Sequence, residues 1–282
     1  MKEMRQISIY GKGGVGKSTV ASNLSVALAE KGRKVMQVGC SPKSDSTYFI
    51  LQKMCEPTIL NQIRMKGSRE EPISECVKTG YKGIVCAETG GPEPAQGCAG
   101  RGVLLALNLL RKYRLYDKHE VDFMVYDVIA DVVCGGFAQP MRKGYASEVY
   151  IVTSGELMSL YSMNNICYAV KIMNELKGVE VKVGGFIDNM RGIPNERELV
   201  EEFSKLLGVP VMAHIPRSDL ITEAEASKGT VMQHFPDSEV ASEFMNLADM
   251  VMEPRGVYPN PMDPKESIGI ILGLLRKHQV FA

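Results

Sequence analysis

A glycine-rich stretch near the amino end of the chain carries the residue types that bind nucleotide phosphates. Residues 11–18 read Gly-Lys-Gly-Gly-Val-Gly-Lys-Ser and fit the pattern Gly-x-x-x-x-Gly-Lys-Ser/Thr. The glycines let backbone N–H groups converge on phosphate oxygens, Lys17 would reach the β- and γ-phosphates, and Ser18 would ligate Mg²⁺. The alternative is a chance glycine-rich turn. The nucleotide contacts predicted in and beside this loop are Gly11, Gly13, Gly14, Val15, Gly16, Lys17, Ser18 and Thr19.

Three further charged residues extend this phosphate chemistry. Lys12 is a second lysine at the start of the loop, as in P-loop ATPases that resemble partition, septum-site and reductase ATPases. There it reaches the nucleotide of the other subunit and stabilises phosphoryl charge only when the dimer closes; the alternative is a solvated surface lysine. Asp127 ends an apolar run and would hold Mg²⁺ through water, and Asp131 would orient the attacking water. The alternative for each aspartate is a helix N-cap. The predicted catalytic residues are Lys12, Lys17 and Asp131.

Two of the seven cysteines, Cys98 and Cys134, lie among glycines where a helix or tight turn is expected to begin. The free N–H groups and the dipole there favour a thiolate and can donate to inorganic sulfide. A [4Fe–4S] cluster needs four thiolates, so two chains that share one cluster on a two-fold axis would complete the set. The alternative is a pair of buried structural cysteines. We interpret the other five cysteines as core or incidental residues.

The elements that must position these residues follow from hydrophobic periodicity. Residues 5–10 alternate as a strand does, and residues 18–31 have helical spacing with Gly32 as the predicted C-cap. Strands alternating with helices predict a mostly parallel sheet with helices on both faces. We expect one α/β P-loop NTPase domain over residues 1–282, with a C-terminal extension from about residue 255. Further strands are predicted at 34–38, 121–128, 148–152 and 181–187, and further helices at 157–176 and 195–207.

The composition limits the classes of partner. Lys plus Arg and Asp plus Glu number 33 each, and a neutral chain gives no electrostatic support for nucleic acid or an anionic membrane as the main partner. No stretch approaches the roughly 20 apolar residues of a transmembrane helix, and residues 1–10 lack the apolar region of a signal peptide. The odd number of cysteines argues against a disulfide framework. We therefore expect a cytoplasmic protein that binds neither nucleic acid nor membrane.

The chain resembles the nitrogenase iron protein (reductase component) family in four segments, which read YGKGGVGKST, VGCSPKSDST, TGGPEPAQGCAGRG and YDVIADVVCGGFAQP. Relatives in that family include the ATP-driven reductase components of protochlorophyllide, chlorophyllide, nickel-tetrapyrrole and methylthio-alkane reductases. The resemblance continues to VYPNPMDPKES near the carboxyl end. The paired cysteine motifs do not occur in ordinary partition ATPases.

This resemblance implies an ATP-dependent electron-transfer protein. Cys98 and Cys134 from each of two subunits would hold one [4Fe–4S] cluster per homodimer, and residues 127–134 would form a switch between nucleotide and cluster. The dimer would take electrons from a ferredoxin or flavodoxin. It would bind MgATP, deliver one electron to a nitrogenase or nitrogenase-like catalytic component, and be left with MgADP.

The resemblance also assigns residues outside the loop and the cysteines. Lys43 and Asp45 match the family's first switch, and Asn189 with the Pro216–Arg217 turn matches the adenine-contacting region. Arg101 follows Cys98 on the surface expected to dock the catalytic partner, and in some members the matching arginine is a regulatory modification site.

Departures from the family pattern favour a divergent nitrogenase-like reductase component. The family usually has aspartate where this chain has Ser41, so a carboxylate near Mg²⁺ and the γ-phosphate has become a hydroxyl. This change would slow hydrolysis, shift the coupling, or be offset by Asp45 or Asp131. Ala130 replaces a usual glycine, which would stiffen the second switch, and residues 52–76 match poorly.

Two other functions share much of this pattern. A metal-free switch ATPase of the partition or septum-site type would use the same loop without a cluster. A metallochaperone that carries an assembling cluster would share the fold and the dimer. Iron–sulfur content separates the first alternative from the other two functions, and redox activity with a catalytic partner separates a reductase from a chaperone.

Overall fold

The middle of the molecule is a sheet built from short, nearly continuous apolar runs. The computed structural model describes residues 4–92, 99–129, 138–141, 145–177 and 179–280, and the eight strands in these ranges belong to one sheet. A run such as Phe123–Val128, buried at every position, suits a parallel strand covered on both faces. The strands are β1 (Arg5–Tyr10), β2 (Val35–Cys40), β3 (Lys78–Thr79), β4 (Val85–Glu88), β5 (Phe123–Val128), β6 (Glu148–Thr153), β7 (Lys182–Asn189) and β8 (Val211–Ile215).

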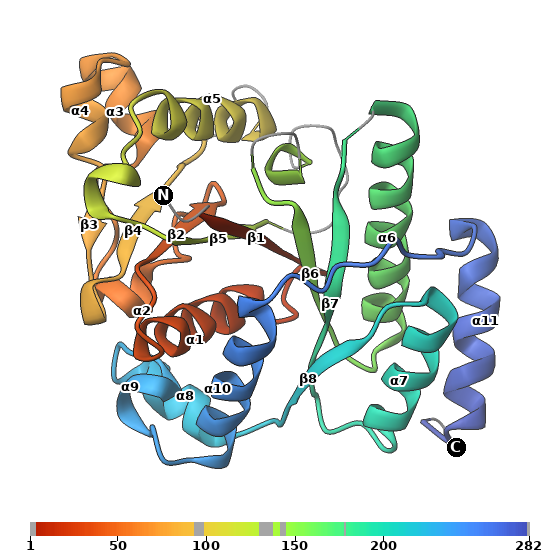
Figure 1. The fold of residues 1–282 in the computed structure, drawn as a ribbon. Helices are drawn as coiled ribbons and strands as arrows, with labels where there is room; N and C mark the ends of the chain where they lie inside the picture. Colours follow the sequence, from red (N-terminus) through yellow and green to blue (C-terminus); the bar gives the residue numbers. More distant parts are fainter. Residues whose placement is uncertain (1–3, 93–98, 130–137, 142–144, 178, 281–282) are drawn as a thin grey trace.

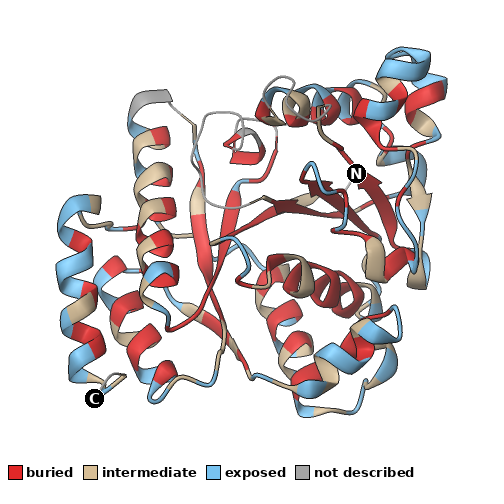
Figure 2. Cartoon of the chain, turned by 180° about the vertical axis from the view of Figure 1, so that it is seen from behind, coloured by how far each residue is buried: buried red, intermediate tan, exposed pale blue. Residues whose placement is uncertain are grey.

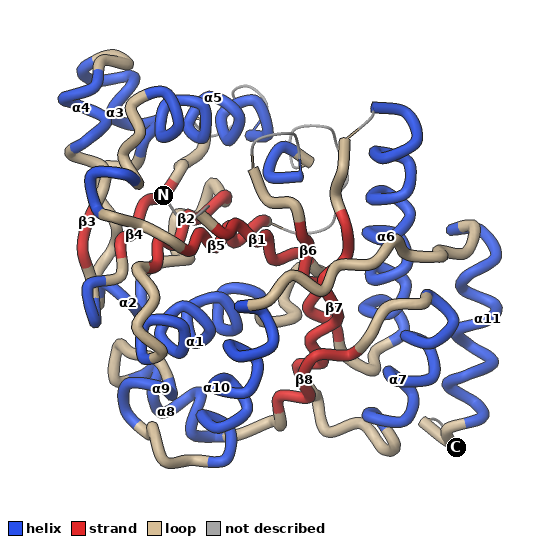
Figure 3. The backbone as a smooth tube through the Cα atoms, in the orientation of Figure 1, coloured by secondary structure: helices blue, strands red, loops and turns tan. Residues whose placement is uncertain are grey.

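The strand order β3-β4-β2-β5-β1-β6-β7-β8 places the first strand of the chain inside the sheet. β1 pairs in parallel with β5 on one side and with β6 on the other, and among the described pairs only the short edge pair β3–β4 is antiparallel. Figure 3 shows the strands as one twisted layer with helices around it. Because the inner strands run in the same direction, the segments that follow them meet at one edge, where such sheets bind ligands.

Helices cover both faces of this sheet (Figure 1). Alternate residues of β5 enter two separate hydrophobic clusters, Phe123 and Val125 on one side and Met124 and Tyr126 on the other. Figure 2 shows that the inner strands are buried along most of their lengths. With Phe123 lie α1 (Lys17–Glu30), α2 (Tyr48–Leu51), α8 (Asp219–Ala226), α9 (Val231–His234) and α10 (Glu239–Met252). With Met124 lie α3 (Ile59–Lys66), α4 (Glu70–Ser74), α5 (Ala99–Lys112), α6 (Leu157–Lys177), α7 (Glu196–Leu207) and α11 (Pro264–Lys277).

The predicted fold class is confirmed, and the differences are local. The strand predicted from residue 121 begins at Phe123, because the N–H of Val121 bonds the Tyr116 carbonyl in the preceding turn. The C-cap of α1 is Lys31 rather than Gly32, which follows in a left-handed conformation with φ 80°. The prediction lacks the strands β3, β4 and β8 and the helices α2, α3, α4, α8, α9 and α10.

The carboxyl-terminal helix α11 packs on the face of the sheet that α6 and α7 cover. Ile271 and Leu275 are buried there, and the segment before the helix is fixed by a pair of hydrogen bonds between Asn164 and the backbone of Met262. At the other end of the helix, the ammonium of Lys277 lies 2.7 Å from the Glu202 carboxylate. Among the described helices, none is both long and apolar enough to cross a membrane.

Candidate functional site

The glycine-rich loop connects the end of β1 to the start of α1. Two of its glycines are required by geometry. A Cβ on Gly11 would lie 2.2 Å from the Val152 carbonyl oxygen, and a Cβ on Gly16 would lie 2.3 Å from the side-chain nitrogen of Asn189. Both glycines have positive φ, 147° and 96°, which side chains disfavour. Gly16 is the N-cap of α1, so the free N–H groups of that helix face the loop, as phosphate binding requires.

Two side chains, one from the last residue of β7 and one from just beyond it, hold the loop from outside. The Asn189 amide donates a hydrogen bond of 2.7 Å to the Val15 carbonyl, and the Arg191 guanidinium donates one of 2.6 Å to the Gly14 carbonyl. These bonds fix the orientation of two peptide groups of the loop. Asn189 therefore touches the nucleotide loop, and its contact with adenine stays a prediction.

A cleft of about 420 Å³ lies over the loop and brings three distant segments together. The loop forms its floor, the segment after β2 forms one wall, and the end of β5 forms another. Most of the predicted phosphate and switch residues meet here. The cleft is lined by Gly13, Gly14, Gly16, Lys17, Ser18, Thr19, Ser41, Lys43, Asp45, Asp127, Val128 and Ile129.

Lys17 and Asp127 supply opposite charges in the buried part of this cleft. The ammonium of Lys17 donates a 2.9 Å hydrogen bond to the Lys12 carbonyl, which holds the lysine across its own loop. Burial raises the pKa of Asp127, although hydroxyl hydrogen bonds from Ser18 and Ser46 and the Lys17 charge oppose the rise. A cation at this carboxylate would favour its ionised form. The oxygens of Ser18 and Asp127 are the kind of ligand that Mg²⁺ prefers, so the site fits magnesium.

The wall after β2 contains Ser41, where the family resemblance leads us to expect an aspartate. Ser41 is buried, and its hydroxyl accepts a hydrogen bond of 3.2 Å from the backbone N–H of Lys43. The Ser41 carbonyl accepts a second bond from the N–H of Ser44. Ser41 thus caps a tight turn, whereas Lys43 and Asp45 are exposed at the mouth of the cleft.

Two of the residues predicted to contact adenine, Pro216 and Arg217, lie beyond the cleft. The Pro216–Arg217 turn follows β8 and does not line the cleft; the Arg217 guanidinium donates to the Arg191 carbonyl at 3.3 Å. Glu225 was absent from the prediction, yet its carboxylate accepts a 2.9 Å hydrogen bond from the Thr19 hydroxyl. Thr19 and Glu225 are far apart in the sequence, and the local pattern around Glu225 does not indicate the contact.

Glu196 fixes the loops on the β7 side of the site. One carboxylate oxygen accepts from the N–H groups of Arg191, Gly192 and Ile193 at 2.8, 3.0 and 3.0 Å, and the other accepts from Gly155 at 2.8 Å. A buried carboxylate with this many N–H donors is well stabilised. It therefore sets the position from which Arg191 reaches the nucleotide loop.

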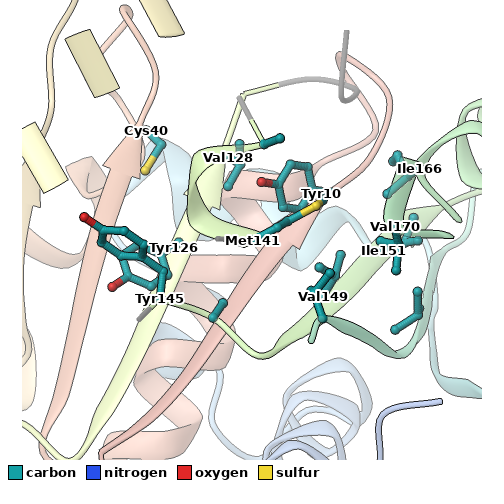
Figure 4. Close-up of a cluster of buried hydrophobic side chains, with 14 of the residues drawn as sticks. Tyr10, Cys40, Tyr126, Val128, Met141, Tyr145, Val149, Ile151, Ile166 and Val170 are labelled. Carbon is teal, nitrogen blue, oxygen red and sulfur yellow. The ribbon is translucent and has the colours of Figure 1, made fainter. Parts of the chain in front are cut away.

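The predicted cluster ligands Cys98 and Cys134, like Asp131 and Ala130, lie outside the described residues. The described part of α5 begins at Ala99, the residue after Cys98 in the sequence. The five described cysteines are buried, and burial raises the pKa of each thiol, as for Cys40 within the apolar cluster of Figure 4. Such thiols are poor metal ligands. Within the described ranges, no group of three or more His, Cys, Asp or Glu side chains is placed to hold a metal ion.

Solved structures share this fold at low sequence identity. The septum site-determining protein MinD from Pyrococcus horikoshii OT3, complexed with Mg-ADP, superposes with a TM-score of 0.65 at 24% identity, covering 88% of this chain and 96% of that one. A ParA family ATPase from Chlorobium tepidum TLS gives 0.65 at 19% identity, covering 86% and 98%. These likenesses show the P-loop NTPase fold.

Sequence relatives are much closer. The nitrogenase iron protein of Methanospirillum hungatei JF-1 is 47% identical over 264 residues, which cover 93% of each chain. Nitrogenase iron protein 2 of Methanothermobacter thermautotrophicus Delta H is 46% identical over 264 residues, which cover 93% of this chain and 96% of that one. Residues 5–274 match the family described as 4Fe-4S iron sulfur cluster binding proteins, NifH/frxC family. The family resemblance found in the motifs is confirmed, and the chain belongs to the NifH/frxC family of 4Fe-4S iron–sulfur cluster binding proteins.

Proposed function

We propose that this protein is an ATP-dependent electron-transfer protein, a homodimer that couples MgATP hydrolysis to one-electron delivery to a nitrogenase or nitrogenase-like catalytic component. The observation that carries the proposal is the cleft in which Lys17, Ser18 and Asp127 converge, in a chain of the NifH/frxC family. Both relatives described above are named nitrogenase iron proteins, and they match the chain along almost its full length.

The chemistry that belongs to this chain is phosphoryl transfer to water. Lys17 exchanges its bond to the Lys12 carbonyl for the β- and γ-phosphates. Ser18 would ligate Mg²⁺, and Asp127 would hold it through water. Lys12 acts on the nucleotide of the partner subunit, and Asp131 orients the attacking water.

A [4Fe–4S] cluster, bound between the subunits, supplies one-electron chemistry. Cys98 and Cys134 from each chain are the proposed ligands, supported by the burial of the other five thiols. The segment from Asp127 to Cys134 joins the nucleotide site to the cluster, so a change at the magnesium ligand is passed to a cluster ligand along a short stretch of backbone. Lys43 and Asp45 belong to the first switch, the segment after β2 that also lines the nucleotide cleft.

The partners follow from the same scheme. A ferredoxin or flavodoxin donates the electron, and the catalytic component docks on the surface that carries Arg101, an exposed residue in the first turn of α5. Asn189 and the Pro216–Arg217 turn contact adenine, which requires the nucleotide base to lie beyond the β7 and β8 ends of the sheet.

The deciding experiment is anaerobic purification, followed by iron and sulfide analysis and EPR spectroscopy of the dithionite-reduced protein with and without MgATP. We expect about four irons per dimer and a reduced-cluster signal that changes when MgATP is added. A folded, ATP-binding dimer that stays iron-free after reconstitution would contradict the proposal and favour a metal-free switch ATPase. A cluster that transfers to apoprotein acceptors, without electron delivery to a catalytic component, would identify a metallochaperone.

A further inference from the structure

Glu88 is a buried carboxyl group for which the proposed reaction gives no role. It ends β4 and is fully buried. One carboxyl oxygen accepts two 2.8 Å hydrogen bonds from the same residue, one from the Thr47 N–H and one from its hydroxyl. The other oxygen has no hydrogen-bond partner among the described residues. An apolar side chain would be the usual occupant of such a position, because burying a carboxyl group with half its bonds unmade is costly.

The strand beside Glu88 is shaped to receive it. A Cβ on Gly39 would lie 1.8 Å from one carboxyl oxygen of Glu88 and 2.6 Å from the other. Gly39 has no positive φ, so backbone conformation does not require glycine there. Space for the Glu88 head group is what requires it.

Glu88 holds Thr47, which is the last residue of the cleft wall formed by residues 41–47. Ser41, Lys43 and Asp45 line the cleft, and Thr47 is the N-cap of α2. Ser46 lies between Asp45 and Thr47 in the sequence. Its carbonyl accepts a hydrogen bond from the Ser22 hydroxyl at 3.0 Å, and its hydroxyl bonds the Asp127 carboxylate. The Glu88–Thr47 pair therefore fixes the end of the wall next to the residue that touches the predicted magnesium ligand.

The same strand end continues toward a predicted cluster ligand. After Glu88, the N–H of Thr89 bonds the Gly39 carbonyl at 2.9 Å. A Cβ on Gly91 would lie 2.5 Å from Pro42, so the backbone at Gly91 lies directly against the start of the cleft wall. The chain then runs to Cys98. The wall and the connection to Cys98 thus meet twice, at Glu88–Thr47 and at Gly91–Pro42.

We propose that Glu88 is a positioning residue for the nucleotide site, which holds residues 41–47 in their nucleotide-binding arrangement and links that wall to the connection leading to Cys98. The link to Cys98 rests on the proposed function, whereas the effect on nucleotide binding does not. A contact of this kind gives the cluster a second connection to the nucleotide, through the first of its two cysteines in sequence.

Four variants test the nucleotide part of this proposal by calorimetric titration with MgATP, alongside thermal unfolding. Glu88→Ala removes the acceptor, and Gly39→Ala displaces the intact carboxyl group; we expect each to weaken MgATP binding by about tenfold or more. Glu88→Gln keeps the oxygen that Thr47 uses and should stay within about threefold of the wild type at pH 7. Glu148→Gln is the matched control, because Glu148 is a buried carboxylate on β6 bonded to Arg5 and Gly256. It should lower the melting temperature and leave the affinity unchanged.

Wild-type affinity in a folded Glu88→Ala or Gly39→Ala protein would overturn the proposal. An affinity loss that Glu148→Gln reproduces at the same loss of thermal stability would also overturn it. If Glu88→Ala does not fold, Thr47→Val removes only the hydroxyl contact, and it should weaken MgATP binding while Thr47→Ser does not.

The link to Cys98 has its own readout. In the reduced, cluster-loaded dimer, saturating MgATP should produce a smaller change of the EPR signal in Gly39→Ala than in the wild type. A full spectral change at saturating nucleotide would overturn the link. If the chain carries no cluster, the proposed function fails, and the calorimetric comparison still decides the role of Glu88.

Discussion

The side-chain amide of Asn189 and the carbonyl of Val15 form a 2.7 Å hydrogen bond that joins the end of β7 to the nucleotide loop. The amide nitrogen occupies the space that a Cβ on Gly16 would take. Glycine at position 16 therefore leaves the space that the Asn189 side chain needs to make this bond. The loop is positioned by a strand two places away from β1 in the sheet as well as by its own sequence.

Replacing Asn189 by aspartate should weaken MgATP binding by about tenfold, because a carboxylate cannot donate to the Val15 carbonyl and repels it. Isothermal titration measures the effect. Asn174→Asp is the control, since the Asn174 amide also donates to backbone carbonyls but lies in α6 away from the cleft. Unchanged affinity in Asn189→Asp would show that the loop keeps its shape without this bond.

The two loop lysines should separate binding from hydrolysis. Lys17 is buried over the loop, so Lys17→Gln should abolish measurable MgATP binding. Lys12 is only partly buried; Lys12→Gln should keep the affinity and lower the hydrolysis rate by roughly 10³-fold, as expected for a cross-subunit cation. Phosphate release under saturating MgATP provides the measurement, with Lys31→Gln at the end of α1 as the surface control. Wild-type turnover in Lys12→Gln would identify a solvated lysine.

Restoring the family aspartate at Ser41 should make nucleotide binding more dependent on magnesium. An aspartate can still accept from the Lys43 N–H, but it adds negative charge to a cleft that already contains Asp45 and Asp127. We expect Ser41→Asp to lower the affinity for ATP in EDTA more than the affinity for MgATP. Ser41→Asn is the neutral control of similar size. Equal losses with and without magnesium would contradict the electrostatic explanation.

Removing either predicted cluster ligand should remove the iron. Cys98→Ser and Cys134→Ser should reduce the iron from about four atoms per wild-type dimer to near zero, since thiolate ligands are lost from a shared site. Cys167→Ala should retain the iron, because that thiol is buried in α6 and burial raises its pKa. Iron and sulfide analysis after anaerobic purification decides. Full iron content in both serine variants would place the ligands elsewhere.

The stability of the protein should fall as the pH rises from about 5 to about 8. Burial, with lesser contributions from the Asp127 and Asp45 charges, raises the pKa of Glu88 to about 8, whereas an unfolded glutamate titrates near 4.3. The folded state therefore binds more protons in this interval, and stability is lost as Glu88 ionises. One pKa unit corresponds to about 1.4 kcal/mol, so the loss should amount to a few kcal/mol. Urea unfolding across this range should show a shallower slope for Glu88→Gln than for the wild type.

An identical slope in that variant would assign the pH dependence to other groups. Asp188 is one candidate, because burial raises its pKa to about 6 beside His214. The difference between the two proteins, rather than the wild-type slope alone, therefore reports on Glu88.

The sequence predicted those parts of the site that depend on neighbouring residues. The loop motif, its flanking strand and helix, and Asp127 at the end of an apolar run were all readable, because each is a local pattern. The contacts of Thr19 with Glu225 and of Gly14 with Arg191 were not, since they join residues that only the sheet order brings together. Glu88 gave no signal, because an acidic residue at a strand end reads as solvent-exposed. The small helices α8 and α9 were missed because each offers too few turns to show a clear period.

The inner position of β1 has a consequence for the order of biosynthesis. β1 is made first, but its two partners are β5 and β6, so the strand that carries the nucleotide loop has both of its neighbours only after residue 153 has emerged. Cys98 and Cys134 both precede that point in the sequence. Because domains fold as their segments become available during synthesis, both predicted cluster ligands are made before the sheet around the nucleotide loop is complete.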